Sequence, residues 1–98
     1  MVRVLFSPEA EHDLLSLYDY IADRAGPDVA LGFVERIEAQ CLGLVMFPDR
    51  GTRRDDVRPD LRLIGFERRV TIAFHRQGDL VVIDRILYGG RDVAALAD

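Results

Sequence analysis

The chain of 98 residues contains no lysine, so all 13 of its basic residues are arginines. The arginine side chain carries a planar, permanently charged group that suits carboxylates, phosphates and aromatic rings, and it is a poor proton donor or acceptor. A GC-rich genome would produce part of this bias, but the arginines are also unevenly placed. Residues 1–49 hold 3 arginines against 9 acidic residues, whereas residues 50–98 hold 10 against 8. The net charge of −4 therefore hides a C-terminal half that suits an anionic partner.

Cysteine is almost absent as well. A single cysteine, Cys41, excludes an internal disulfide and fits a reducing compartment. It falls on the apolar side of a predicted helix, which favours a buried core thiol over a nucleophile. The two histidines, His12 and His75, lie far apart in sequence, and no cluster of cysteine, histidine and acidic residues has the spacing of metal ligands. We therefore expect neither a metal nor another cofactor.

Long apolar runs are missing too. No segment is long enough to cross a bilayer, and the apolar residues before Ser7 are too few for the core of a signal peptide. These absences predict a soluble, cytoplasmic protein. The length, together with the lack of repeats and linkers, predicts a single domain over residues 1–98.

The apolar spacing and the turn residues predict a mixed α+β fold. Ser7 and Pro8 supply an N-cap and a first-turn proline, and apolar residues then recur at helical spacing until Gly26-Pro27 ends the helix. The expected elements are a strand at 2–6, a helix from residue 8, a second helix from Pro27 to the FPDRG segment (47–51), a polar loop at 52–60, and strands at 61–66, 69–76 and 80–88. This order predicts an N-terminal strand, an antiparallel two-helix hairpin and a three-stranded antiparallel meander, with the helices packed on one face of the sheet.

The last strand decides which side chains the uncovered face presents. If Val81, Ile83 and Leu87 face the helices, simple alternation places Leu80, Val82, Ile86 and Tyr88 on the opposite face. An apolar patch bordered by arginine suits an acidic, amphipathic partner segment that folds as it binds. The alternative is that the tail after residue 91, with the sequence VAALAD and room for a turn or two of helix, covers part of this face.

Six arginines lie on or beside the three C-terminal strands: Arg62, Arg68, Arg69, Arg76, Arg85 and Arg91. Two interpretations stay open, a solvated face whose arginines pair with nearby acids and a binding face for another molecule. Arg85 interrupts an apolar strand, so we expect it to pair with an acid, with Asp84 on the opposite face. His75 has no partner that the sequence reveals, which makes a general-base role a minor alternative. Gly89 and Gly90 leave room for a close approach just before Arg91.

Several ordered segments together resemble the toxins of the RelE/ParE superfamily, and more closely its ParE branch. The segments are SPEAEHDLLSLYDYIA, FPDRG, LRLI and RVTIAFHRQGDLVVIDRILYGGRD. The resemblance implies a small toxin that is encoded with an antitoxin and held inactive by it. For the ParE branch it implies poisoning of DNA gyrase, and for the RelE branch it implies cleavage of mRNA on the ribosome.

The RelE-type ribonucleases resemble one another in a set of basic residues and a tyrosine in the tail. Arg62 and Arg91 fall where two of these basic residues lie, but Ile64, Thr71 and Ala97 occupy the places of the others and of the tyrosine. Cleavage of RNA needs proton transfer as well as charge stabilisation, and arginine supplies mainly the second. We therefore assign no catalytic residue and expect a protein inhibitor of DNA gyrase, neutralised by a ParD-like antitoxin.

The predicted contacts with the target or the antitoxin are Arg62, Arg69, Arg76, Arg85, Tyr88 and Arg91. Two alternatives remain at this point, a ribosome-dependent mRNA endoribonuclease and a non-toxic interaction module with the same fold.

Overall fold

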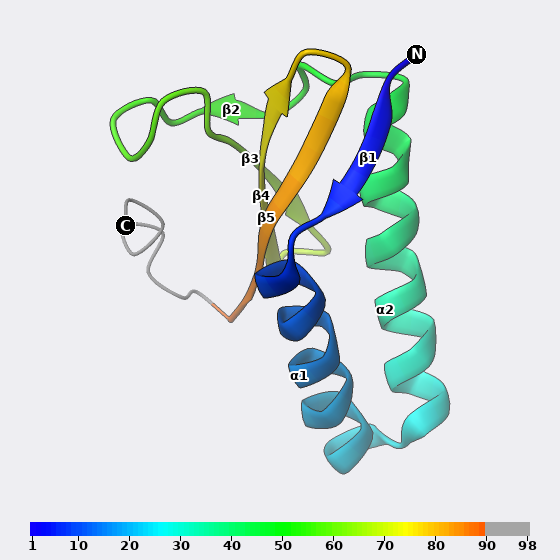
Figure 1. Cartoon of the computed structure of the whole chain (residues 1–98). Coiled ribbons are helices and arrows are strands. Elements are labelled where there is room, and N and C mark those ends of the chain that lie inside the picture. Colours follow the sequence, from blue (N-terminus) through cyan, green and yellow to red (C-terminus); the bar gives the residue numbers. More distant parts are fainter. Residues whose placement is uncertain (90–98) are drawn as a thin grey trace.

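The structure, a computed structural model, describes residues 1–89 (Figure 1). Its elements are β1 (Arg3–Phe6), α1 (Pro8–Ala25), α2 (Pro27–Leu42), the 3-10 helix η1 (Gly43–Val45), β2 (Thr52–Arg53), β3 (Arg62–Phe66), β4 (Val70–Gln77) and β5 (Leu80–Tyr88). They form one five-stranded sheet in the order β1-β5-β4-β3-β2, with α1 and α2 packed on one face. The predicted α+β class, helix hairpin and antiparallel meander are confirmed. The predicted helical turns of the tail lie outside the described residues.

Local chemistry explains the ends of α1. The Ser7 hydroxyl accepts a hydrogen bond from the backbone N–H of Ala10 at 3.0 Å and donates one to the carbonyl oxygen of Asp84 at 2.9 Å. This cap therefore both starts α1 and attaches it to β5. At the other end Gly26 has a φ of 97°, and its N–H donates to Ala22, so the chain reverses there into α2.

The segment predicted as an irregular loop contains a short strand. Thr52 and Arg53 form β2 and pair with β3, which makes the sheet wider than the sequence indicated. Gly51 permits this pairing, because its φ is 94° and a Cβ there would lie only 2.6 Å from the carbonyl oxygen of Leu63. The α-helical part of α2 also ends earlier than expected, at Leu42, and continues as η1.

A β-bulge interrupts the pairing of β4 with β5. Ala73 is paired with Arg85 and Phe74 with Ile83, so Asp84 is the extra residue on β5. One extra residue shifts the in–out alternation of everything that follows it.

This shift makes part of the predicted side-chain arrangement wrong. Val81 and Ile83 pack with the helices as expected, but Ile86 also belongs to the helix-side core cluster and Tyr88 packs against it. Leu87, predicted to face the helices, packs instead with Leu61 and Ala73 on the other face. Leu80 and Val82, which precede the bulge, keep their predicted place on the face away from the helices.

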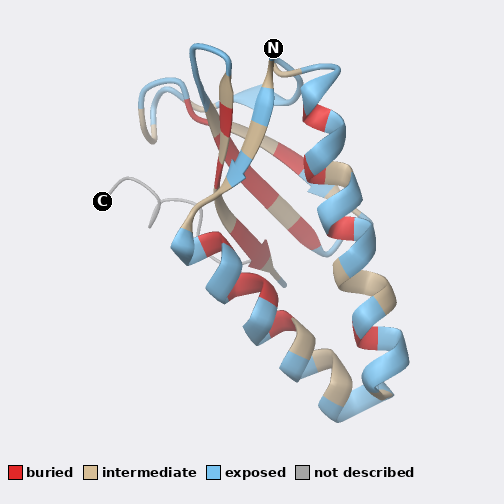
Figure 2. Ribbon diagram, turned by 45° about the vertical axis from the view of Figure 1, so that its right-hand side comes forward, coloured by how far each residue is buried: buried red, intermediate tan, exposed pale blue. Residues whose placement is uncertain are grey.

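The main core lies between the helix hairpin and the sheet, and Figure 2 shows buried residues along the sides of α1 and α2 that face the strands. Its fully buried members include Ile37 and Cys41 from α2 and Ile72, Phe74 and Ile83 from the sheet. The predicted core position of the Cys41 thiol is confirmed, and burial raises its pKa to about 12. Within residues 1–89, neither helix is long and apolar enough to cross a bilayer.

Candidate interaction surfaces

Arg85 makes a nearly buried ion pair with α1. Its Nε and Nη2 donate to the two carboxylate oxygens of Asp13 at 2.7 and 3.1 Å, and one of these oxygens also accepts the backbone N–H of Ile86 at 2.9 Å. The Asp13 side chain is only 6% exposed, and its hydrogen bonds raise the pKa of Arg85. Asp13 therefore fixes α1 against β5 directly after the bulge, and the predicted pairing of Arg85 with an acid is confirmed.

Tyr88 continues β5 on the same side of the sheet. Its ring lies 5.6 Å from that of Tyr20 and 6.3 Å from that of Phe33, so it contacts both helices. Arg85 and Tyr88 line a cleft of about 470 Å³ together with His12, Ser16 and Tyr20 of α1.

Arg69 lies on a second cleft, of about 430 Å³, which Tyr88 also lines. Opposite it, Arg36 of α2 donates two hydrogen bonds to the carboxylate of Glu67, at 2.9 and 3.2 Å. This pair lowers the pKa of Glu67 and ties the β3–β4 turn to α2.

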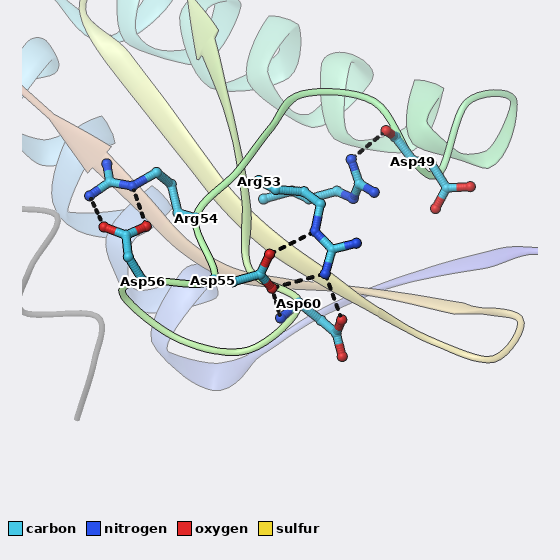
Figure 3. A network of polar contacts seen from close by, with 7 residues as sticks. Asp49, Arg53, Arg54, Asp55, Asp56 and Asp60 are labelled. Atoms are coloured by element: carbon cyan, nitrogen blue, oxygen red, sulfur yellow. Dashed lines mark hydrogen bonds and ion pairs between the residues drawn. The ribbon is translucent and has the colours of Figure 1, made fainter.

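Arg62 and Arg76 lie near the C-terminal end of α2, away from these two clefts. Arg62 donates to the carbonyl oxygen of Asp49 at 2.7 Å, and Arg76 pairs with the Asp49 carboxylate at 3.2 Å. In the neighbouring loop, Arg53 binds Asp55 and Asp60, and Arg54 binds Asp56 (Figure 3). Hydrogen bonds from these arginines lower the pKa values of Asp55 and Asp56.

The six residues predicted as a contact set therefore do not form one patch. Arg85, Tyr88 and Arg69 belong to the two adjoining clefts, and Arg62 and Arg76 gather around Asp49. Arg91 lies outside the described residues. Arg76 and Arg85 are held in internal pairs, as the first interpretation of the arginines predicts, and a binding role for the set stays a prediction.

A polar cluster on the face away from the helices was missed by the sequence reasoning. Asp84, the bulge residue, forms an ion pair with Arg58 at 2.8 Å, and its carboxylate lies 2.7 Å from Nδ1 of His75. Asp84 is thus the partner of His75 that the sequence did not reveal, and it faces away from Arg85 as predicted. Arg58 belongs to a polar loop in which no spacing distinguishes it from its neighbours.

The sheet face away from the helices is covered by side chains in one half and open in the other. Val57 and Leu61 pack over Ala73 and Leu87 and close the half nearest the 54–61 loop. The other half presents Leu5, which is 51% exposed, with the partly buried Leu80 and Val82 beside it. Leu5 is in register with Val82, and the exposed Arg3 with Leu80. We call these four residues, Arg3, Leu5, Leu80 and Val82, the open strip.

Comparison with known proteins assigns a family to this arrangement. Residues 4–93 match the family model described as ParE toxin of type II toxin-antitoxin system, parDE. The chain belongs to the ParE toxin family. It is 33% identical over 95 residues to Toxin ParE3 of Caulobacter vibrioides, an alignment that covers 97% of this chain and 94% of the relative. A solved structure of the chromosomal ParDE toxin–antitoxin system from P. aeruginosa superimposes with a TM-score of 0.81 at 27% identity, over 92% of this chain and 98% of the other.

As a ParE-type toxin of a toxin–antitoxin system, this chain has an antitoxin as its partner. The choice of the ParE branch over the RelE branch is confirmed. In the described part of this ParE-family chain, no three histidine, cysteine or acidic side chains gather as a metal site would require.

Proposed function

We propose that this chain arrests growth by binding DNA gyrase as a protein inhibitor, and that a ParD-like antitoxin neutralises it by covering the open strip. Membership of the ParE branch supports the proposed inhibition of DNA gyrase, because the resemblance to that branch implies gyrase poisoning. The arginine-only chemistry supports binding over strand cleavage, since guanidinium groups are poor at proton transfer.

The open strip supports the antitoxin part. It joins apolar side chains on an edge strand and its neighbour with the exposed cation Arg3 at one end. An amphipathic segment with leucine-like residues on one side and acids at its margin would bury Leu5 and Val82 and neutralise Arg3. The 54–61 loop already covers the adjoining half, so a short segment is enough to close the face.

The gyrase part is tested by a supercoiling assay with purified gyrase, relaxed plasmid and ATP. We expect the toxin to block supercoiling and an equimolar amount of antitoxin to prevent the block. Primer extension on cellular transcripts after induction is the companion measurement. Cuts at codon-spaced positions with unimpaired supercoiling would contradict the proposal and favour the ribonuclease alternative, and induction without any growth arrest would favour the interaction module.

The antitoxin part is tested with two matched leucine substitutions. Leu5→Glu places a carboxylate in the open strip, whereas Leu15→Glu makes the same change on α1 at a leucine that is 67% exposed. We expect Leu5→Glu to weaken antitoxin binding by about tenfold or more, as for loss of an apolar contact at an interface centre, and Leu15→Glu to leave it unchanged. Equal affinities of both variants in a titration calorimeter would remove the open strip from the antitoxin contact.

A further inference from the structure

Half of the aromatic residues of the chain gather at the edge of the main core, where three of them pack against it without being fully buried. Four rings form a continuous series, in which Tyr20 lies 5.6 Å from Tyr88, Tyr88 lies 6.3 Å from Phe33, and Phe33 lies 6.0 Å from Phe66. None of the four is fully buried, and Tyr20 is 44% exposed. Tyrosine and phenylalanine that stay partly accessible in a group of this kind are typical of the centre of a protein interface.

This series is flanked by two clefts of similar size. The cleft of about 470 Å³ lies between α1 and the end of β5, and the cleft of about 430 Å³ lies between α2 and the β3–β4 turn. Tyr88 lines both and therefore forms the ridge between them. Within residues 1–89, the hydroxyl groups of Tyr20 and Tyr88 make no hydrogen bond to another residue.

Arginines surround the rings. The guanidinium of Arg24 lies 3.7 Å from the centre of the Tyr20 ring and that of Arg36 lies 5.4 Å from the centre of the Phe33 ring. Arg69 and Arg85 line the clefts, where the acids are Asp13, Asp28 and Glu67. Asp13 and Glu67 are already bound by arginines, and the Arg69 side chain has no ion pair within residues 1–89. The charges that line the two clefts therefore balance at three arginines and three acids, and Arg24 beside Tyr20 adds one further cation.

The rim of the second cleft is held in a costly backbone conformation. Glu67 and Arg68, the central residues of the β3–β4 turn, have φ values of 47° and 63°, which asparagine and glycine adopt far more readily. Two such residues cost on the order of 1 kcal/mol each. In this turn Glu67 binds Arg36 and lines the cleft, and Arg69, which follows the turn's two central residues, lines it as well.

We infer that these groups form a docking site for the target, separate from the surface that binds the antitoxin. We call it the Tyr88 surface, and it consists of Tyr20, Phe33, Phe66 and Tyr88 with Arg24, Arg36 and Arg69. Its occupant is a segment of the target protein that places an apolar side chain in a cleft beside Tyr88 and a carboxylate against Arg69. The Tyr88 surface lies on the helix side of the sheet and the open strip lies on the other face. This inference rests on the proposed inhibition of gyrase.

The test compares two variants of the Tyr88 surface with a matched control. Arg69→Glu reverses an exposed charge there, Tyr20→Ser removes an exposed ring, and Arg50→Glu reverses an exposed charge beyond the end of α2. Each variant is first shown by circular dichroism to melt at the wild-type temperature. The concentration for half-inhibition of gyrase supercoiling, the dissociation constant for the antitoxin and growth arrest after induction are then measured.

We expect Arg69→Glu and Tyr20→Ser to raise the half-inhibitory concentration by about tenfold or more while antitoxin affinity stays at the wild-type value. Arg50→Glu should change neither quantity. Wild-type inhibition by both Tyr88-surface variants would overturn the inference, as would a parallel loss of antitoxin binding. If the wild-type toxin does not inhibit gyrase, the proposed function is wrong. The growth arrest caused by each variant then tests the docking site by itself. Loss of arrest in both variants then supports a docking site for another acidic target, whereas full arrest refutes the site.

Discussion

Replacing Asp13 by asparagine should destabilise the fold far more than the loss of an ordinary surface ion pair. The Asp13 carboxylate is 6% exposed and accepts three hydrogen bonds, two from Arg85 and one from Ile86. Asparagine keeps the shape but loses the charge, and its NH₂ group turns a donor toward other donors. Breaking a buried pair costs about 3–5 kcal/mol, and the 31% exposure of the Arg85 side chain lets water recover part of this. We therefore expect a loss of about 2–3 kcal/mol.

Urea unfolding followed by circular dichroism measures this loss as a free energy of unfolding. For a chain of this length, 2–3 kcal/mol corresponds to a fall in melting temperature of roughly 10–20 °C. The control is Asp56→Asn, because Asp56 forms an exposed pair with Arg54, and exposed pairs of this kind stabilise a fold little. A loss from Asp13→Asn no greater than that of the control would contradict this prediction, because it would show that water already solvates the Asp13 pair.

Three further predictions follow from single groups. Gly51→Ala should cost about 1–3 kcal/mol in urea unfolding, because the new Cβ meets the Leu63 carbonyl at a positive φ, whereas Gly43→Ala, with open space around it, should be nearly neutral. Because burial raises the pKa of the Cys41 thiol from its ordinary value of 9.0 to about 12, stability should fall as pH rises through this interval, and a Cys41→Ala variant should lack that part of the fall. The pKa of Glu67 lies below its ordinary value of 4.5. The Glu67–Arg36 pair should therefore stabilise the fold above pH 4.5, and this stabilisation should be lost as the pH falls through the lowered pKa. An NMR titration of Glu67 with a midpoint at 4.5 would contradict this prediction.

The helix hairpin and the antiparallel meander could be predicted because their causes are local. Ser7 caps α1, Gly26 ends it, and apolar side chains recur at a helical period between them. The pairing of Arg85 with an acid could also be predicted, since a cation in an otherwise apolar strand needs a partner. Which acid it binds could not, because Asp13 is 72 residues away and equally well explained as an acid near a helix start.

The one error of consequence arose at the bulge, and its cause is tertiary. Alternation along β5 is a valid expectation only while each residue faces one partner on β4, and Asp84 breaks that rule. The bulge is held from both faces, since the Asp84 carboxylate binds Arg58 on one face and Asp13 binds the next residue, Arg85, and the N–H of Ile86 on the other. These contacts come from a loop and a helix far away in sequence, so no window around Asp84 contains them. Because the bulge shifts the alternation along β5, Tyr88 faces the helices. Its ring then lies between the two clefts, on the same surface as Arg69. The sequence therefore shows which residues could form that surface, whereas their arrangement in space depends on one unpaired residue in β5.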